Sequence, residues 1–139
     1  MNERKIIHVV AAVIKKGNLI LATQRGYGDF KGMWEFPGGK IEDGEDKKEA
    51  LKREIKEELN ASINIEDELC TVNYAYPDFD LIMDAFMCTL NDDKLDKVYH
   101  NDTELEHEDY KWLTTQNIEE VEWLPADIEI VNKLKTNQR

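Results

Sequence analysis

Three glutamates, Glu54, Glu57 and Glu58, lie close together in the charged stretch KREIKEEL. If this stretch is helical, residues three and four apart share one side of the helix, where like charges repel one another. Clustered carboxylates are stabilised by hard cations such as Mg²⁺ or Mn²⁺, which prefer oxygen ligands. The spacing therefore indicates a divalent-metal site. From this stretch alone, a surface helix whose glutamates pair with its many lysines is the alternative.

The helix that carries these glutamates is expected to run from Asp46 to about Asn60. Asp46 and Glu49 have the spacing of a capping box, and asparagine tolerates the left-handed conformation that ends many helices. On a helical wheel the three glutamates lie at the edge of the apolar face, where a cleft could form. That apolar face consists of Leu51, Ile55 and Leu59.

A glycine pair, Gly38-Gly39, precedes the helix in the stretch WEFPGGKIE. Glycine allows the backbone to pass close to the helix, so that the carbonyl oxygen of Gly38 could face the same metal ion. Lys40 follows directly and supplies a positive charge suited to phosphate. A carboxylate-bound metal beside a lysine indicates a substrate that contains phosphate.

The remaining elements follow from hydrophobic periodicity and turn residues. Strands alternate with helices in a pattern typical of a mixed sheet with helices on both faces. We expect strands at 6–14, 19–23, 34–36, 69–76, 81–90 and 110–113, a hairpin turn at 16–18, a breaker at 37–39, a helical turn at 118–121 and a last helix at 125–135.

Length and charge limit the classes of function. The chain has 139 residues, which fits one domain spanning 1–139, and a net charge of −12. This charge argues against duplex nucleic acid as a partner, and no apolar run is long enough to span a membrane. Cys70 and Cys88 lie in strand-like runs and are expected as reduced thiols, which fits a cytoplasmic location. A small-molecule substrate and a monomer or homodimer are expected.

The bend and the helix resemble the signature of the Nudix hydrolases, G-x5-E-x7-R-E-U-x-E-E-x-G-U, in which U is a bulky aliphatic residue. Two positions depart from it, since Asn60 replaces the glycine and Ala61 replaces the aliphatic residue, whose role Ile63 could take. The matching positions are Gly39, Glu45, Arg53, Glu54, Ile55, Glu57 and Glu58.

The resemblance extends to the MutT-type branch of that family through WEFPGGKIE, YPDFDLIMDAF and WLPADIEIVNKL, and so covers most of the chain. It implies a Nudix fold, an α/β/α sandwich with a mixed sheet. It also implies hydrolysis of a nucleoside triphosphate to the monophosphate and pyrophosphate. Two alternatives stay open: hydrolysis of another linked diphosphate, such as ADP-ribose or a dinucleoside polyphosphate, and a sensor that binds a nucleotide without cutting it.

The resemblance assigns roles to the charged residues. Glu45 and Arg53 would pair and fix the loop against the helix, with Mg²⁺ as the expected cofactor and Mn²⁺ as a substitute. A glutamate from a late loop would complete the metal site and act as a base, with Glu106 as the best match and Glu104 and Glu108 as rivals. The expected metal ligands are Gly38, through its carbonyl, and Glu54, Glu57, Glu58 and Glu106.

Four residues are expected to contact the nucleotide: Arg25, Lys40, Phe79 and Asp127. Phe79 and Trp34 could stack on a base, although core packing is favoured for Trp34. An ionised Asp127 could accept hydrogen bonds from guanine N1–H and N2–H₂ or from the amino group of cytosine. Its alternative role is interaction with the dipole of the last helix. The resemblance covers MutT-type enzymes that remove 8-oxo-dGTP and others that prefer cytosine nucleotides, so it implies both as candidate substrates.

Overall fold

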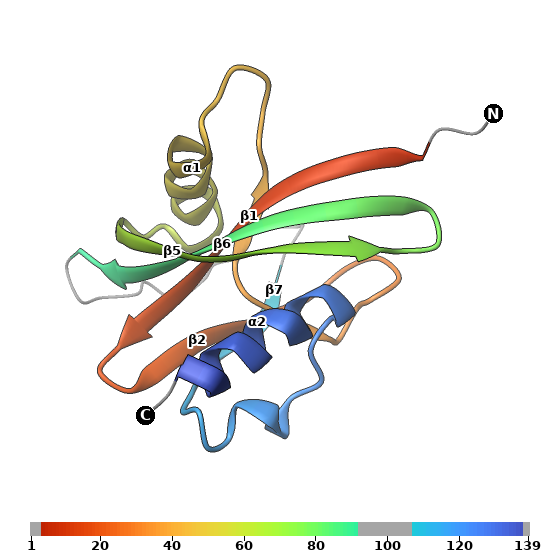
Figure 1. Cartoon of the computed structure of the whole chain (residues 1–139). Coiled ribbons are helices and arrows are strands. Elements are labelled where there is room, and N and C mark those ends of the chain that lie inside the picture. The colour runs from red at the N-terminus through yellow and green to blue at the C-terminus, as the bar shows by residue number, and fades with distance from the viewer. Residues whose placement is uncertain (1–3, 92–106, 138–139) are drawn as a thin grey trace.

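The computed structural model describes residues 4–91 and 107–137 of the chain. A seven-stranded sheet lies between two helices, α1 (Lys47–Leu59) and α2 (Pro125–Asn137), which cover opposite faces of the sheet (Figure 1). This confirms the expected α/β/α sandwich with a mixed sheet. No helix in the described ranges is long and apolar enough to cross a membrane.

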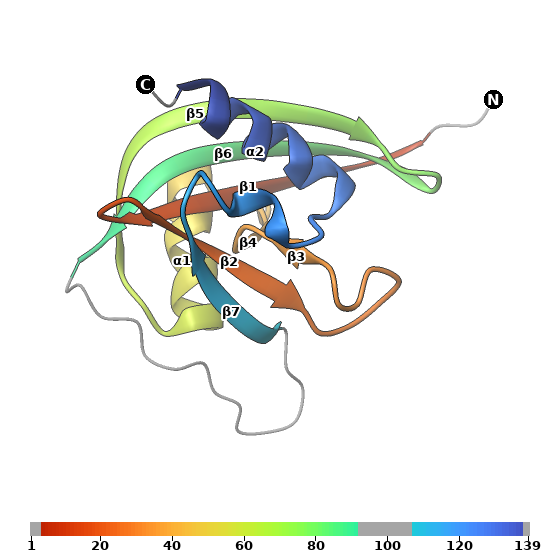
Figure 2. The same cartoon turned by 90° about the horizontal axis from the view of Figure 1, so that it is seen from below.

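Five strands lie side by side in the order β3-β2-β1-β6-β5, while β4 also pairs with β1 and β7 with β2 (Figure 2). The β1–β6 pair is parallel and the other pairs are antiparallel, which makes the sheet mixed. The strands are β1 (Lys5–Lys16), β2 (Leu19–Arg25), β3 (Trp34–Glu35), β4 (Gly38–Lys40), β5 (Ile63–Ala75), β6 (Phe79–Leu90) and β7 (His107–Leu113), and a 3₁₀ turn, η1, spans Ile118–Glu120.

The apolar run of β1 is continuous because both of its faces are buried. Val10, Ala12 and Ile14 pack against the α1 side, and Ala11 and Val13 pack in the core under α2. Strand β1 is therefore the central support from which both helices, and the site residues on them, are positioned.

Helix α1 begins and ends as expected from its sequence. The Asp46 side chain accepts hydrogen bonds from the backbone N–H groups of Lys48 and Glu49, at 2.8 and 3.2 Å, and Glu49 completes the capping box. Asn60 ends the helix in the left-handed conformation, with a φ of 53°. The buried face matches the expected one, with Ala50 added to Leu51, Ile55 and Leu59.

Two expectations about the strands differ from the structure by more than a few residues or in the type of element. Strand β5 begins at Ile63 and not at Leu69, because an edge strand can keep its pairing while polar side chains face water. The Pro37-Gly38-Gly39 bend does not break the sheet, since Gly38–Lys40 pairs with Val9, Val10 and Ala11 as β4. A side chain on Gly38 would collide with the carbonyl group of Val10, so glycine permits this close pairing.

Candidate active site

Arg53 joins the loop before α1 to the helix itself. Its Nε and Nη2 atoms donate to the two carboxylate oxygens of Glu45 at 2.7 and 2.9 Å, so the predicted pairing is confirmed. Nη2 also donates to the carbonyl oxygen of Lys40 at 3.0 Å. Nη1 lies 3.0 Å from Glu54 and 3.4 Å from Glu57. The hydrogen bonds from Arg53 lower the pKa of Glu45 to about 2, which keeps that carboxylate ionised.

Glu54 packs directly over the glycine bend. A side chain built on Gly39 would collide with all three atoms of the Glu54 carboxyl group. Because Gly39 has no side chain, the Glu54 carboxyl group can lie against the β4 backbone, and a larger residue at 39 would displace it. The bend and the helix form one unit, which the sequence predicts from their spacing.

An outer cavity of about 550 Å³ runs along this contact. Carboxylates and backbone carbonyls are the donors that Mg²⁺ takes, and the close contact of Glu54 with Gly39 brings both kinds of donor to the edge of this cavity. In the described ranges, however, no group of three or more His, Cys, Asp or Glu side chains is gathered closely enough to hold a metal ion. Glu57 is exposed and bonded to Arg53. The residues that line the cavity include Gly38, Gly39, Lys40, Glu42, Glu54 and Glu58.

The late-loop glutamates cannot be placed from the described residues. Glu106 and Glu104 lie outside them, and Glu108 lies in β7 with its side chain outside the described part. The proposed fourth carboxylate of the metal site therefore stays a prediction.

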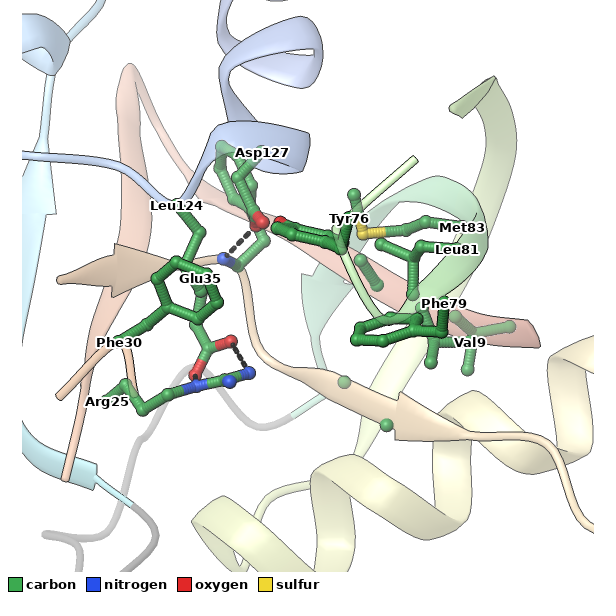
Figure 3. A pocket seen from close by; sticks show the side chains of 15 residues that line it. Val9, Arg25, Phe30, Glu35, Tyr76, Phe79, Leu81, Met83, Leu124 and Asp127 are labelled. Atoms are coloured by element: carbon green, nitrogen blue, oxygen red, sulfur yellow. Dashed lines mark hydrogen bonds and ion pairs between the residues drawn. The ribbon is translucent and has the colours of Figure 1, made fainter. Parts of the chain in front are cut away.

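An inner cavity of about 140 Å³ adjoins the outer one. Figure 3 shows Asp127 reaching it from the start of α2, and Tyr76 and Phe79 coming from the β5–β6 turn. The Tyr76 and Phe79 rings stack with centroids 5.2 Å apart, and the Phe30 ring lies 5.6 Å from that of Tyr76. Aromatic faces beside a buried acid suit a planar heterocycle.

Asp127 is 5% exposed, and its Oδ2 atom accepts a hydrogen bond from the backbone N–H of Phe36 at 3.0 Å. Burial, with a smaller effect from the negative charge of Glu35, raises the pKa of Asp127 to about 8. Asp127 is thus not simply a solvated acid at a helix terminus. Close to neutral pH its carboxyl group can carry a proton and then both donate and accept.

Arg25 reaches the cavities together with a residue that the sequence did not single out, Glu35. The Arg25 guanidinium donates to Glu35 at 3.2 and 2.6 Å, and it also lies 5.1 Å from the ring of Tyr27. Both Arg25 and Glu35 line both cavities. Because successive side chains of a strand point to opposite faces, Glu35 faces away from its buried neighbours Trp34 and Phe36. Its closeness to Arg25 depends on the pairing of β2 with β3, which the sequence does not reveal.

Tyr76 is a second residue of the inner cavity that was not among the residues expected to contact the nucleotide. Its hydroxyl oxygen accepts a hydrogen bond from the N–H of Ala126 at 3.1 Å, which ties the aromatic wall to the start of α2. Trp34 behaves as expected for core packing, since it is 7% exposed and belongs to the core under α2. The aromatic candidates for a base are therefore Phe79 and Tyr76.

The sequence matches a known protein family over a range that includes the described residues of both cavities. Residues 5–134 match the NUDIX domain. The 8-oxo-dGTP diphosphatase of Proteus vulgaris is 36% identical over 91 residues, which cover 64% of this chain and 81% of that protein. The CTP pyrophosphohydrolase of Escherichia coli is 44% identical over 62 residues, which cover 44% of this chain and 46% of that protein.

Solved structures with the same fold cover nearly all of the chain. A MutT protein from methicillin-resistant Staphylococcus aureus is 35% identical, with a TM-score of 0.72, and the match covers 98% of this chain and all of that one. A MutT protein from Methanosarcina mazei is 25% identical, with a TM-score of 0.76, over the full length of both chains.

Proposed function

Since the chain belongs to the NUDIX family, we propose that it is a metal-dependent nucleoside triphosphate pyrophosphohydrolase, which forms the nucleoside monophosphate and pyrophosphate. We further propose that its substrates are 8-oxo-dGTP or cytosine nucleotides, that its cofactor is Mg²⁺, with Mn²⁺ as a substitute, and that it acts in the cytoplasm. Removal of damaged nucleotides from the cellular pool is the task that this activity would serve.

The observation that carries the proposal is the continuity of the two cavities. The inner cavity contains the aromatic rings and Asp127, and the outer one contains Glu54 and Glu58. Gly39 and Phe79 line both cavities, so the two spaces meet between β4 and the start of β6. A nucleotide has the same division, with a flat base at one end and charged phosphates at the other.

At the phosphate end, the residues of α1 and β4 position charge. Arg53 fixes the Glu45 loop against α1 through two hydrogen bonds, and Lys40 lines the outer cavity as a cation for a phosphate oxygen. Glu54 and Glu58 present carboxylate oxygens to the same cavity. A bound divalent cation would neutralise the triphosphate and stabilise charge that develops on its oxygens. These residues would mainly hold the substrate in position for attack by water.

At the base end, the protonation state of Asp127 determines which hydrogen-bonding groups of a base its carboxyl group can pair with. A neutral carboxyl group donates to one atom and accepts from another, which complements N3 and the N4 amino group of cytosine. An ionised carboxylate only accepts, which complements N1–H and N2–H₂ of guanine. Because the pKa of Asp127 is raised to about 8, the neutral form dominates at pH 7 and supports the cytosine nucleotides.

The test is pyrophosphate release with Mg²⁺ from 8-oxo-dGTP, dGTP, dCTP, CTP, 5-methyl-dCTP, ADP-ribose and diadenosine tetraphosphate, at pH 6.5 and pH 9. We expect release from the triphosphates, with the cytosine-to-8-oxoguanine ratio of kcat/KM falling as the pH rises. Cleavage of ADP-ribose or diadenosine tetraphosphate without release of pyrophosphate from any triphosphate would overturn the proposal, while leaving the family membership intact.

A further inference from the structure

A buried carboxylate, Asp84, lies on β6 outside both cavities. It is 2% exposed, and its Oδ1 atom accepts a hydrogen bond from the hydroxyl of Thr71 at 2.6 Å. Its Oδ2 atom lies 2.6 Å from Nε2 of His8 and 3.3 Å from Nζ of Lys47. Burial alone would raise the pKa of Asp84, but the hydrogen bonds from Thr71, His8 and Lys47 outweigh it and lower the pKa. The nucleotide site described above does not use this charge.

Asp84 belongs to a row of residues that crosses the sheet to the glycine bend. Thr71 pairs with Asp84, Asp84 with Val10, and Val10 with Gly39. Paired residues in neighbouring strands point to the same face, which is here the face under α1, because Val10 packs there. Two strand spacings separate Asp84 from Gly39, a distance of about 10 Å.

Two residues of helix α1 are separated by about the same distance as Asp84 and Gly39. Lys47 and Glu54 are seven residues apart, which is about 10.5 Å along a helix and nearly the same direction around it. Lys47 contacts Asp84, and Glu54 packs over Gly39. Figure 2 shows α1 running across the strands on the face opposite α2. Helix α1 therefore contacts this row at two points, through Lys47 at Asp84 and through Glu54 at Gly39.

We propose that Asp84 is a positioning residue for the metal-binding face of α1. It holds Lys47, and through Lys47 it sets where Glu54 and Glu58 lie relative to Gly38 and Gly39. This inference rests on the proposed function, because it assumes that these glutamates bind the metal. Asp84 itself touches neither metal nor substrate.

A comparison of two lysines near the N-terminus of α1 distinguishes the positioning role of Lys47 from a general effect of charge on helix stability. A positive charge in the first turn of a helix is unfavourable, because the N-terminus carries partial positive charge. Lys47 is the first residue of α1 and Lys48 follows it, and both side chains are exposed, that of Lys47 to 45%. Removing either charge should relieve the same repulsion. Only the removal of Lys47 breaks the contact with Asp84, so Lys48→Met is the matched control for Lys47→Met.

The experiment measures Mg²⁺ affinity in two ways, by the rise in melting temperature with added Mg²⁺ and by the Mg²⁺ concentration that gives half-maximal activity. We expect Lys47→Met to weaken Mg²⁺ binding on the order of threefold to tenfold, less than the loss of a group bonded directly to a metal ligand. Lys48→Met should leave binding unchanged, and Lys47→Arg should restore most of it. Equal Mg²⁺ affinity in Lys47→Met and Lys48→Met would overturn the inference.

A double variant tests whether Asp84 acts through Lys47. Asp84→Asn with Lys47→Met should weaken Mg²⁺ binding no more than Asp84→Asn alone, whereas additive losses would contradict a shared pathway. If the unaltered protein responds to Mg²⁺ and the variants match it, only this inference fails. If the unaltered protein shows no Mg²⁺ response at all, the proposed function fails and this inference fails with it.

Discussion

The carboxyl group of Glu54 occupies the space that a side chain on Gly39 would need. This contact brings the backbone of β4 against the flank of α1, at the edge of the outer cavity. The metal proposal depends on this closeness, because a carbonyl oxygen and carboxylates from two separate elements must reach one ion. The contact also yields a test that needs neither substrate nor metal.

Gly39→Ala should destabilise the protein by about 1 kcal/mol, since the added methyl group must displace the Glu54 carboxylate from its hydrogen bond with Arg53. Urea unfolding in the presence of EDTA measures this cost. In a Glu54→Ala background the same methyl group should cost much less, because its space is then open. Equal costs in the two backgrounds would contradict the contact.

Acid should remove the stabilisation that Glu45 receives from Arg53. The pKa of Glu45 is lowered from 4.5 to about 2 in the folded protein, chiefly by its hydrogen bond with Arg53. The contribution is therefore complete above about pH 4.5 and is lost as the pH falls towards 2. Urea midpoints between pH 6 and 2.5 should fall less steeply for Glu45→Gln than for the unaltered protein.

The exposed Glu129 on α2 provides the control for this pH series. Glu129→Gln should leave the pH dependence of the urea midpoint as it is. A Glu45→Gln curve that runs parallel to both others would show that the pairing with Arg53 adds no pH-dependent stability.

Asp127 should affect the pH dependence of stability in the direction opposite to that of Glu45. Its pKa is raised from 3.8 to about 8 in the folded protein, so between these values the folded state holds a proton that the unfolded state has lost. Stability then decreases as the pH rises from about 4 to about 8, and the decrease ends above the folded pKa. Asp127→Asn removes the ionisation. Its melting temperature relative to the unaltered protein should rise steadily from pH 5 to pH 8, and a constant difference would contradict the buried protonation.

Phe79→Ala should weaken binding of the nucleotide base without slowing the hydrolysis step. The ring of Phe79 stacks on that of Tyr76 and lines both cavities, but it lies on the β5–β6 side and not on α1. We expect KM for the nucleotide to rise roughly tenfold while kcat changes little, because the lost contact is made in both the ground and transition states. Ile128→Ala, an exposed apolar truncation on α2, is the control. A fall in kcat with KM unchanged would contradict a binding role.

Much of the metal end could be predicted from the sequence because its determinants are local. The capping box of Asp46 and Glu49, the left-handed Asn60 and the apolar stripe fix α1 within a few residues of the expected bounds. The spacing from Gly39 to Glu54 then brings the bend to the helix, and the pairing of Glu45 with Arg53 follows. The gathering of three glutamates around a common point is not reproduced in the described residues, where Arg53 holds Glu54 and Glu57.

The base end could be predicted only in part because it depends on contacts between distant segments. Phe79 and Asp127 were expected from their stretches, and both line the inner cavity. Glu35 and Tyr76 were not, since their roles arise from the β2–β3 register and from a hydrogen bond spanning 50 residues of sequence. Asp84 was missed for the same reason, because its partners come from β1, β5 and α1.

The measurement that tests the central claim most directly is Mg²⁺-dependent pyrophosphate release by Glu54→Gln, Glu57→Gln and Glu58→Gln, each compared with the exposed-surface variant Glu129→Gln. Glutamine keeps the size of the side chain but removes the charge that a hard cation needs. We expect each of the three to lose activity by about a hundredfold or more while melting cooperatively, as metal-dependent stabilisation of developing charge is lost. Turnover close to that of Glu129→Gln in all three variants would show that these glutamates do not hold the catalytic metal.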